Sequence, residues 1–65
     1  MQEILSTITR LVDAEVLAAT ESSIMAREAT TIEGMIGGLL LTEARLEAAL
    51  AMIRGARALA DRGVA

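Results

Sequence analysis

An uninterrupted run of helix-compatible residues from Glu3 to Glu33 constrains the fold of this chain more than any other feature. The run contains no Gly, Pro or Asn. Its apolar residues alternate at spacings of four and three, beginning Ile4, Ile8 and Leu11, as on one face of a coiled-coil helix. The pattern predicts a helix over about 3–33, roughly 45 Å long. Propensity alone does not stabilise such a helix, so we expect a partner along its length.

Three of the five glycines follow this run, at Gly34, Gly37 and Gly38. Glycine is common where a helix ends because it adopts positive φ readily. We therefore predict a bend over 34–38 and a second helix over about 39–61. The alternative is one continuous helix of about 60 residues with a glycine kink.

Residues 62–65 are expected to form a frayed tail. The segment Thr30-Thr31-Ile32-Glu33 has the spacing of a capping box, but it lies inside the predicted first helix and is interpreted as incidental. The fold class is therefore all-α. Residues 1–65 form a single domain, a helical hairpin of two long antiparallel helices.

Composition indicates that the hairpin associates with itself. A chain of 65 residues has a marginal core, and small domains are usually stabilised by disulfides, metals or oligomerisation. Cys and His are both absent, which leaves oligomerisation. The second helix is apolar around most of its circumference, more than one hairpin partner can cover. The predicted oligomer-interface residues are Ile4, Ile8, Leu11, Ala18, Met25, Ile32, Leu39, Leu46, Leu50 and Ile53.

Small residues recur at every fourth position in a ridge that predicts close approach of two helices. The ridge comprises Ala14, Ala18, Ser22, Ala26, Thr30, Gly34 and Gly38. In a bilayer such a ridge would mark a helix-pairing face. However, the most apolar window contains Glu43, Arg45 and Glu47, and a span needs about 20 mostly apolar residues. We therefore expect no membrane span.

Four charged residues are candidates for setting the register: Glu15, Glu28, Arg45 and Arg54. A bend centred near Ile36 brings together residues whose numbers sum to about 72–75. It thus predicts the pairs Glu28–Arg45, Glu15–Arg57, Glu21–Arg54 and Arg27–Glu47. The alternative is that these charges lie at solvated rims.

Several activities conflict with the composition. The net charge of −3 disfavours nucleic acid, whose phosphates require a basic surface. Glu15 and Glu33 lie about 27 Å apart along one helix and cannot act as an acid–base pair. The glycine segment lacks the Lys and Ser/Thr of a phosphate loop. We predict no catalytic, cofactor or metal residues; carboxylates shared across a symmetric oligomer are a minor alternative for metal.

The sequence therefore predicts a non-enzymatic structural protein whose partner is itself, packed through Ala, Leu, Ile and Met faces. The assembly is either a closed bundle or an open helical filament. The alternative is a small adaptor or antitoxin-like module that presents an apolar groove to another helical protein. A helix that forms only on lipid is a further alternative. No signal peptide is visible, so the cytoplasm is the default compartment.

Overall fold

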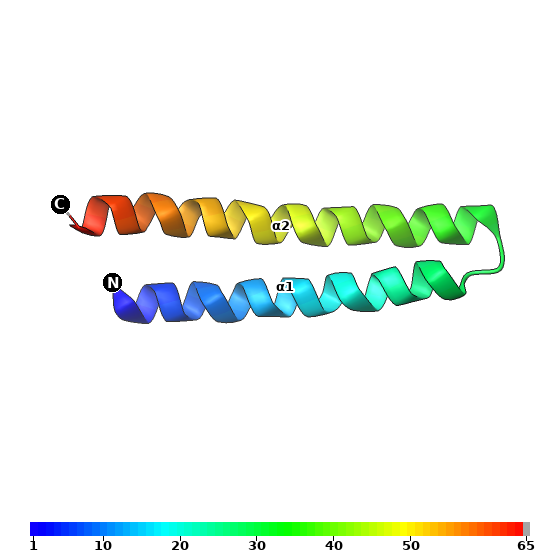
Figure 1. Cartoon of the computed structure of the whole chain (residues 1–65), viewed down its shortest axis with the longest axis horizontal. Coiled ribbons are helices and arrows are strands. Elements are labelled where there is room, and N and C mark those ends of the chain that lie inside the picture. Colours follow the sequence, from blue (N-terminus) through cyan, green and yellow to red (C-terminus); the bar gives the residue numbers. More distant parts are fainter. Residues whose placement is uncertain (65) are drawn as a thin grey trace.

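The computed structural model describes residues 1–64 and contains two helices, α1 (Gln2–Glu28) and α2 (Ile32–Val64). The helices run antiparallel and side by side, and both chain ends lie at the same end of the molecule (Figure 1). The molecule measures 52 × 15 × 9 Å. This arrangement confirms the predicted all-α helical hairpin and contradicts the alternative of one continuous helix.

The turn lies at residues 29–31, so the predicted bend at 34–38 is wrong. Ala29 leaves the helical conformation, with φ −65° and ψ 144°. Thr31 then caps α2: its Oγ1 accepts a hydrogen bond from the Gly34 amide at 3.0 Å, and its carbonyl accepts one from the Met35 amide at 3.0 Å. A threonine cap satisfies an amide that the start of a helix leaves free. This cap makes residue 32 the start of the second helix.

The glycines predicted to form the bend are ordinary helical residues of α2. Among residues 1–64 no glycine has a positive φ, so their conformational freedom is not what the fold uses. The boundaries shift accordingly: α1 ends at Glu28 rather than near 33, and α2 begins at Ile32 rather than 39. Through Val64, the predicted tail is helical, and position 65 lies outside the described residues.

The two helices meet along a seam of buried and half-buried residues spaced alternately three and four apart. In α1 these are Leu5, Ile8, Val12, Glu15, Ala19, Ser22 and Ala26. In α2 the same spacing gives Gly38, Thr42, Arg45, Ala49, Met52, Ala56 and Leu59, of which Arg45 is exposed. The fully buried members are small: Ala19, Ser22, Ala26 and Ala49. The seam therefore holds the helices close together but encloses little apolar volume.

Candidate self-association surface

Gly38 and Ala26 form the closest approach between the helices. A Cβ added at Gly38 would lie 2.7 Å from the Ala26 Cβ and 2.8 Å from its Cα, well inside van der Waals contact. Gly37, one residue earlier, has open space at the equivalent position. The ridge of small residues thus serves the helix contact at Ser22, Ala26 and Gly38, as predicted for close approach.

A pair of hydroxyl groups links the helices one turn further along. The oxygens of Ser22 and Thr42 lie 2.7 Å apart, and Ser22 is only 3% exposed. Ser22 also reaches the Ala19 carbonyl at 3.0 Å, and Thr42 reaches the Gly38 carbonyl at 2.8 Å. Each hydroxyl has one proton to donate. One of the two protons forms the hydrogen bond between the hydroxyls, and the other is donated to a single carbonyl, either that of Ala19 or that of Gly38. A polar pair is thereby satisfied inside the seam.

One ion pair crosses the seam among the described residues: Arg45 Nη1 lies 3.4 Å from Glu15 Oε1. The predicted partners, Glu28 for Arg45 and Arg57 for Glu15, are therefore wrong. The error follows from the turn. With the turn at 29–31, facing residues have numbers that sum to 60 for Glu15 and Arg45, not 72–75.

The other two residues predicted to set the register, Glu28 and Arg54, are exposed. Within the described part of the chain neither has an ion-pair partner. Both lie at solvated positions outside the seam, as expected if these charges are rim residues that set no register. The Glu15–Arg45 pair is what remains of the register prediction.

Large apolar side chains lie mostly outside the seam. The exposed ones are Met1, Ile4, Leu11, Val16, Leu17, Ile24, Met25, Ile32, Met35, Ile36, Leu39, Leu40, Leu41, Leu46, Leu50 and Ile53. Eight of the ten residues predicted for the oligomer interface are in this set, and the other two, Ile8 and Ala18, are half-buried. The predicted apolar face of α1 and the observed seam share Ile8. At alternate positions the seam lies one residue further along, at Leu5, Val12 and Ala26 in place of Ile4, Leu11 and Met25.

The accessible surface is large for a chain of this size. A compact monomer of 6.8 kDa is expected to expose about 4000 Å², and this chain exposes 4981 Å². The difference is about 1000 Å², comparable to the roughly 800 Å² that each partner buries in a standard protein interface. The elongated shape of the hairpin produces this excess, and sixteen large apolar residues contribute to the exposed surface.

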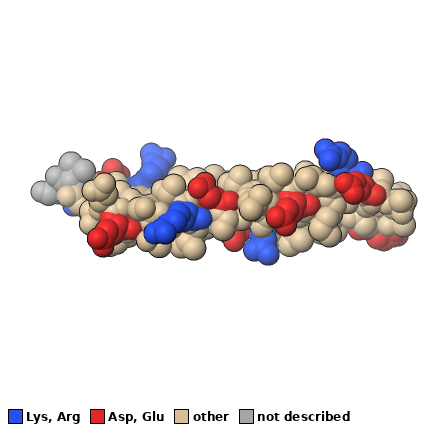
Figure 2. Space-filling model, turned by 90° about the horizontal axis from the view of Figure 1, so that it is seen from below, with Lys and Arg blue, Asp and Glu red and all other residues tan. Residues whose placement is uncertain are grey.

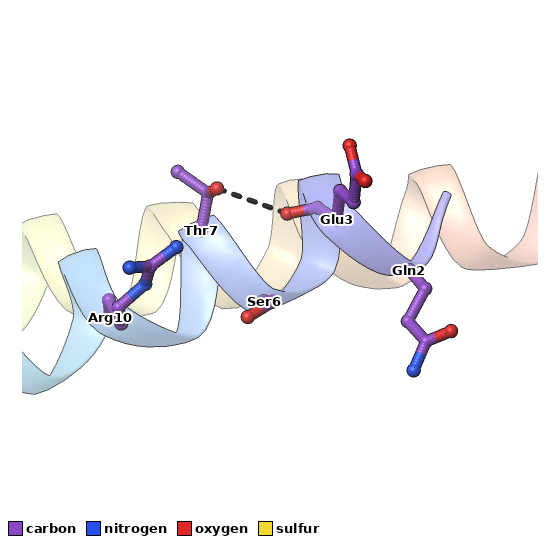
Figure 3. A pocket seen from close by; sticks show the side chains of 5 residues that line it. All are labelled: Gln2, Glu3, Ser6, Thr7 and Arg10. Atoms are coloured by element: carbon purple, nitrogen blue, oxygen red, sulfur yellow. Dashed lines mark hydrogen bonds between the residues drawn. The ribbon is translucent and has the colours of Figure 1, made fainter.

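Several hollows open on the surface of the described residues. One lies along α1 between Gln2 and Arg10 and is lined by successive turns of a single helix (Figure 3). Its Thr7 hydroxyl donates to the Glu3 carbonyl at 3.0 Å, a bond within the helix. Among residues 1–64 no three Asp or Glu side chains gather where they could hold a metal ion. Neither helix, as far as it is described, carries a stretch that is long and apolar enough to cross a membrane.

The fold and its uncovered faces define a helical hairpin with a small-residue seam. Comparisons of the chain with protein-family models, curated proteins and solved structures give no match.

Proposed function

We propose that this chain is a non-enzymatic structural subunit that assembles with copies of itself through the apolar residues outside the seam. The observation that carries the proposal is the inverted distribution of side chains. The buried residues are three alanines and a serine, whereas sixteen large apolar residues are exposed. Ordering a chain costs about 1–2 kcal/mol per residue, and the burial of a few alanine methyl groups offsets little of that cost.

Assembly would supply the missing burial. Fully burying a Leu or Ile side chain contributes about 1.5–3 kcal/mol, so a few of the exposed residues can stabilise both the hairpin and its contacts. Exposed apolar surfaces of this extent mark interaction sites. Both a closed bundle and an open filament would cover them. The same surface would serve the second candidate, an adaptor that presents its apolar face to a different helical protein.

The test is the mass in solution, measured by size-exclusion chromatography with light scattering. Concentration must be followed by refractive index because the chain contains no Trp, Tyr or Cys. A discrete mass of two to four chains supports a closed bundle, and regular fibres seen by electron microscopy support a filament. A folded monomer at concentrations of tens of micromolar would refute self-assembly and favour the adaptor.

A further inference from the structure

One flank of α2 combines apolar and charged residues in a symmetric order. We call it the outer strip of α2. It comprises Leu39, Glu43, Leu46, Glu47, Leu50, Ile53, Arg54 and Arg57, all of them exposed. The positions 39, 43, 46, 50, 53 and 57 are spaced alternately four and three apart and therefore share one face of the helix. Each of these positions follows a seam position by one residue, about 100° further around the helix, so the strip lies on one flank of α2. Leu46 borders a hollow that Val16 and Ile24 of α1 also line.

The charges of the outer strip divide at Leu50. Glu43 lies seven residues before Leu50 and Arg57 seven residues after it; Glu47 lies three before and Arg54 four after. The half of the strip toward the turn is therefore acidic, and the half toward the chain ends is basic as far as Arg57. Asp61, which lines a hollow with Arg54 and Arg57, follows beyond it. Arg45 lies at the level of the acidic half, but it belongs to the seam and forms an ion pair with Glu15 of α1. None of the four strip charges has an ion-pair partner within the described part of the chain.

From this order we infer that the outer strip binds the same strip of a second copy in antiparallel orientation, about a twofold axis near Leu50. The inference rests on the proposed self-assembly and specifies one of its contacts. Antiparallel pairing places Glu43 and Glu47 of each copy beside Arg57 and Arg54 of the other. Parallel pairing places acids beside acids and arginines beside arginines, which is destabilising. A twofold contact of this kind uses the same patch on both subunits.

The apolar centre of the strip supplies the burial for this contact. Leu46, Leu50 and Ile53 lie within four residues of the proposed axis. The three residues of one copy would therefore pack against the same three residues of the other copy. The charges then flank an apolar centre, as the polar rim of an interface does. The α1 side lacks such a division: seen from that side, acidic and basic side chains are interspersed along the whole length of the molecule (Figure 2). Of the two sides, the α2 strip is therefore the one whose charge order is complementary to itself in a second copy.

Single thiols test the orientation, because the chain has no Cys of its own. The variants Glu43→Cys and Arg57→Cys are prepared separately, mixed, and treated with a short bismaleimide. In the antiparallel contact the two thiols come from different variants, so the mixture should yield the covalent heterodimer as its main product. Each variant alone should yield little, because two copies of position 43 lie about 21 Å apart when the axis passes near residue 50.

Charge reversal provides the second measurement. Glu43→Arg with Glu47→Arg makes all four strip charges positive, and should weaken dimerisation at least about tenfold at low salt. Adding Arg54→Glu and Arg57→Glu to the same chain restores the complementary order and should restore the affinity. The quadruple variant keeps the net charge of the natural chain, which separates strip pairing from overall repulsion.

The outcomes separate this inference from the proposed function. An oligomer in which position 43 crosslinks to itself would overturn the antiparallel contact and leave self-assembly intact. An oligomer with no crosslink at either position, unaffected by charge reversal, would place the contact on another face and also overturn the inference. A monomeric natural chain would overturn both proposals.

Discussion

The seam between the helices and the outer strip of α2 use opposite kinds of side chain. The buried positions of the seam are alanine and serine, exposed by 3–6%, whereas Leu39, Leu46, Leu50 and Ile53 of the strip are exposed by 42–59%. Large aliphatic residues are ordinarily the ones inside a protein. The difference indicates that the seam determines how close the helices lie, while most of the free energy available from apolar burial remains outside the single chain.

This division couples folding to association. If the exposed apolar residues are covered only in the assembly, the isolated hairpin has few apolar contacts to offset its conformational entropy. Changes in the outer strip should then affect helicity and mass together. Changes in the seam should affect the stability of the hairpin through packing distance.

The largest effect is expected from a charge at the centre of the outer strip. Leu50→Arg or Ile53→Arg places a guanidinium where a second copy would bury an aliphatic side chain, which is costly without a partner. We expect the assembly to dissociate and helicity to fall, measured by light scattering and circular dichroism. Ser6→Arg, at an exposed polar position of α1, is the matched control and should change neither. Natural mass and helicity in both strip variants would refute this account.

Two adjacent glycines allow a sharper test of the seam. Gly38→Ala puts a Cβ 2.7 Å from the Ala26 Cβ, so the helices must separate, and such overpacking typically costs about 1–3 kcal/mol. Gly37→Ala meets open space and should stabilise the helix by about 1 kcal/mol. Urea unfolding followed by circular dichroism should therefore give opposite shifts. Equal shifts would show that close approach at Gly38 is unimportant.

Parts of the fold were predictable and parts were not, for identifiable reasons. The apolar period of α1 and the absence of proline were enough to predict long helices. Their division into two was predicted from the glycines at 34–38, which the structure places inside α2. The position of the turn was not, because two signals competed: glycines at 34–38, and the Thr30–Glu33 segment with capping spacing. The segment does hold the start of α2, so placing it inside the first helix was wrong, but the cap is Thr31 with Gly34 rather than Thr30 with Glu33. The glycines remain helical because helical glycine needs no special conformation.

The candidate surface was only partly accessible to the same reasoning. The seam position was ambiguous by one residue, because Ile4, Leu11 and Met25 are larger than Leu5, Val12 and Ala26 on average and a period of seven fits both rows. Choosing the larger row follows the usual rule for cores. Here the seam selects small residues, and the larger row stays exposed. The ridge of small residues indicated the correct row at Ala26 but not at Ala19, because it runs through Ala18 instead.

The hydroxyl pair in the seam should have an intermediate effect. Ser22→Ala removes a buried hydroxyl, and Thr42→Val removes its neighbour while conserving shape. Each single change should cost about 0.5–1.5 kcal/mol, the usual net contribution of a hydrogen bond. The double variant should cost less than the sum of the two, because the second change no longer breaks the link between helices. Strict additivity in urea unfolding would indicate that the 2.7 Å contact contributes no coupling.

The smallest effect is expected at the ion pair. The Arg45 side chain is 45% exposed and that of Glu15 is 22% exposed, so solvent screens the pair, and exposed ion pairs contribute about 0.2–1 kcal/mol. Arg45→Gln should lower the unfolding free energy within that range at low salt. The difference should vanish near 1 M salt, where the screening length is about 3 Å. Arg10→Gln, at an exposed position inside α1 without an ion-pair partner among the described residues, is the control and should be neutral. A loss at Arg45 that exceeds about 2 kcal/mol and persists in high salt would contradict the screened geometry. It would mean that assembly buries the pair, and would join this part of the seam to the surface that a second copy covers.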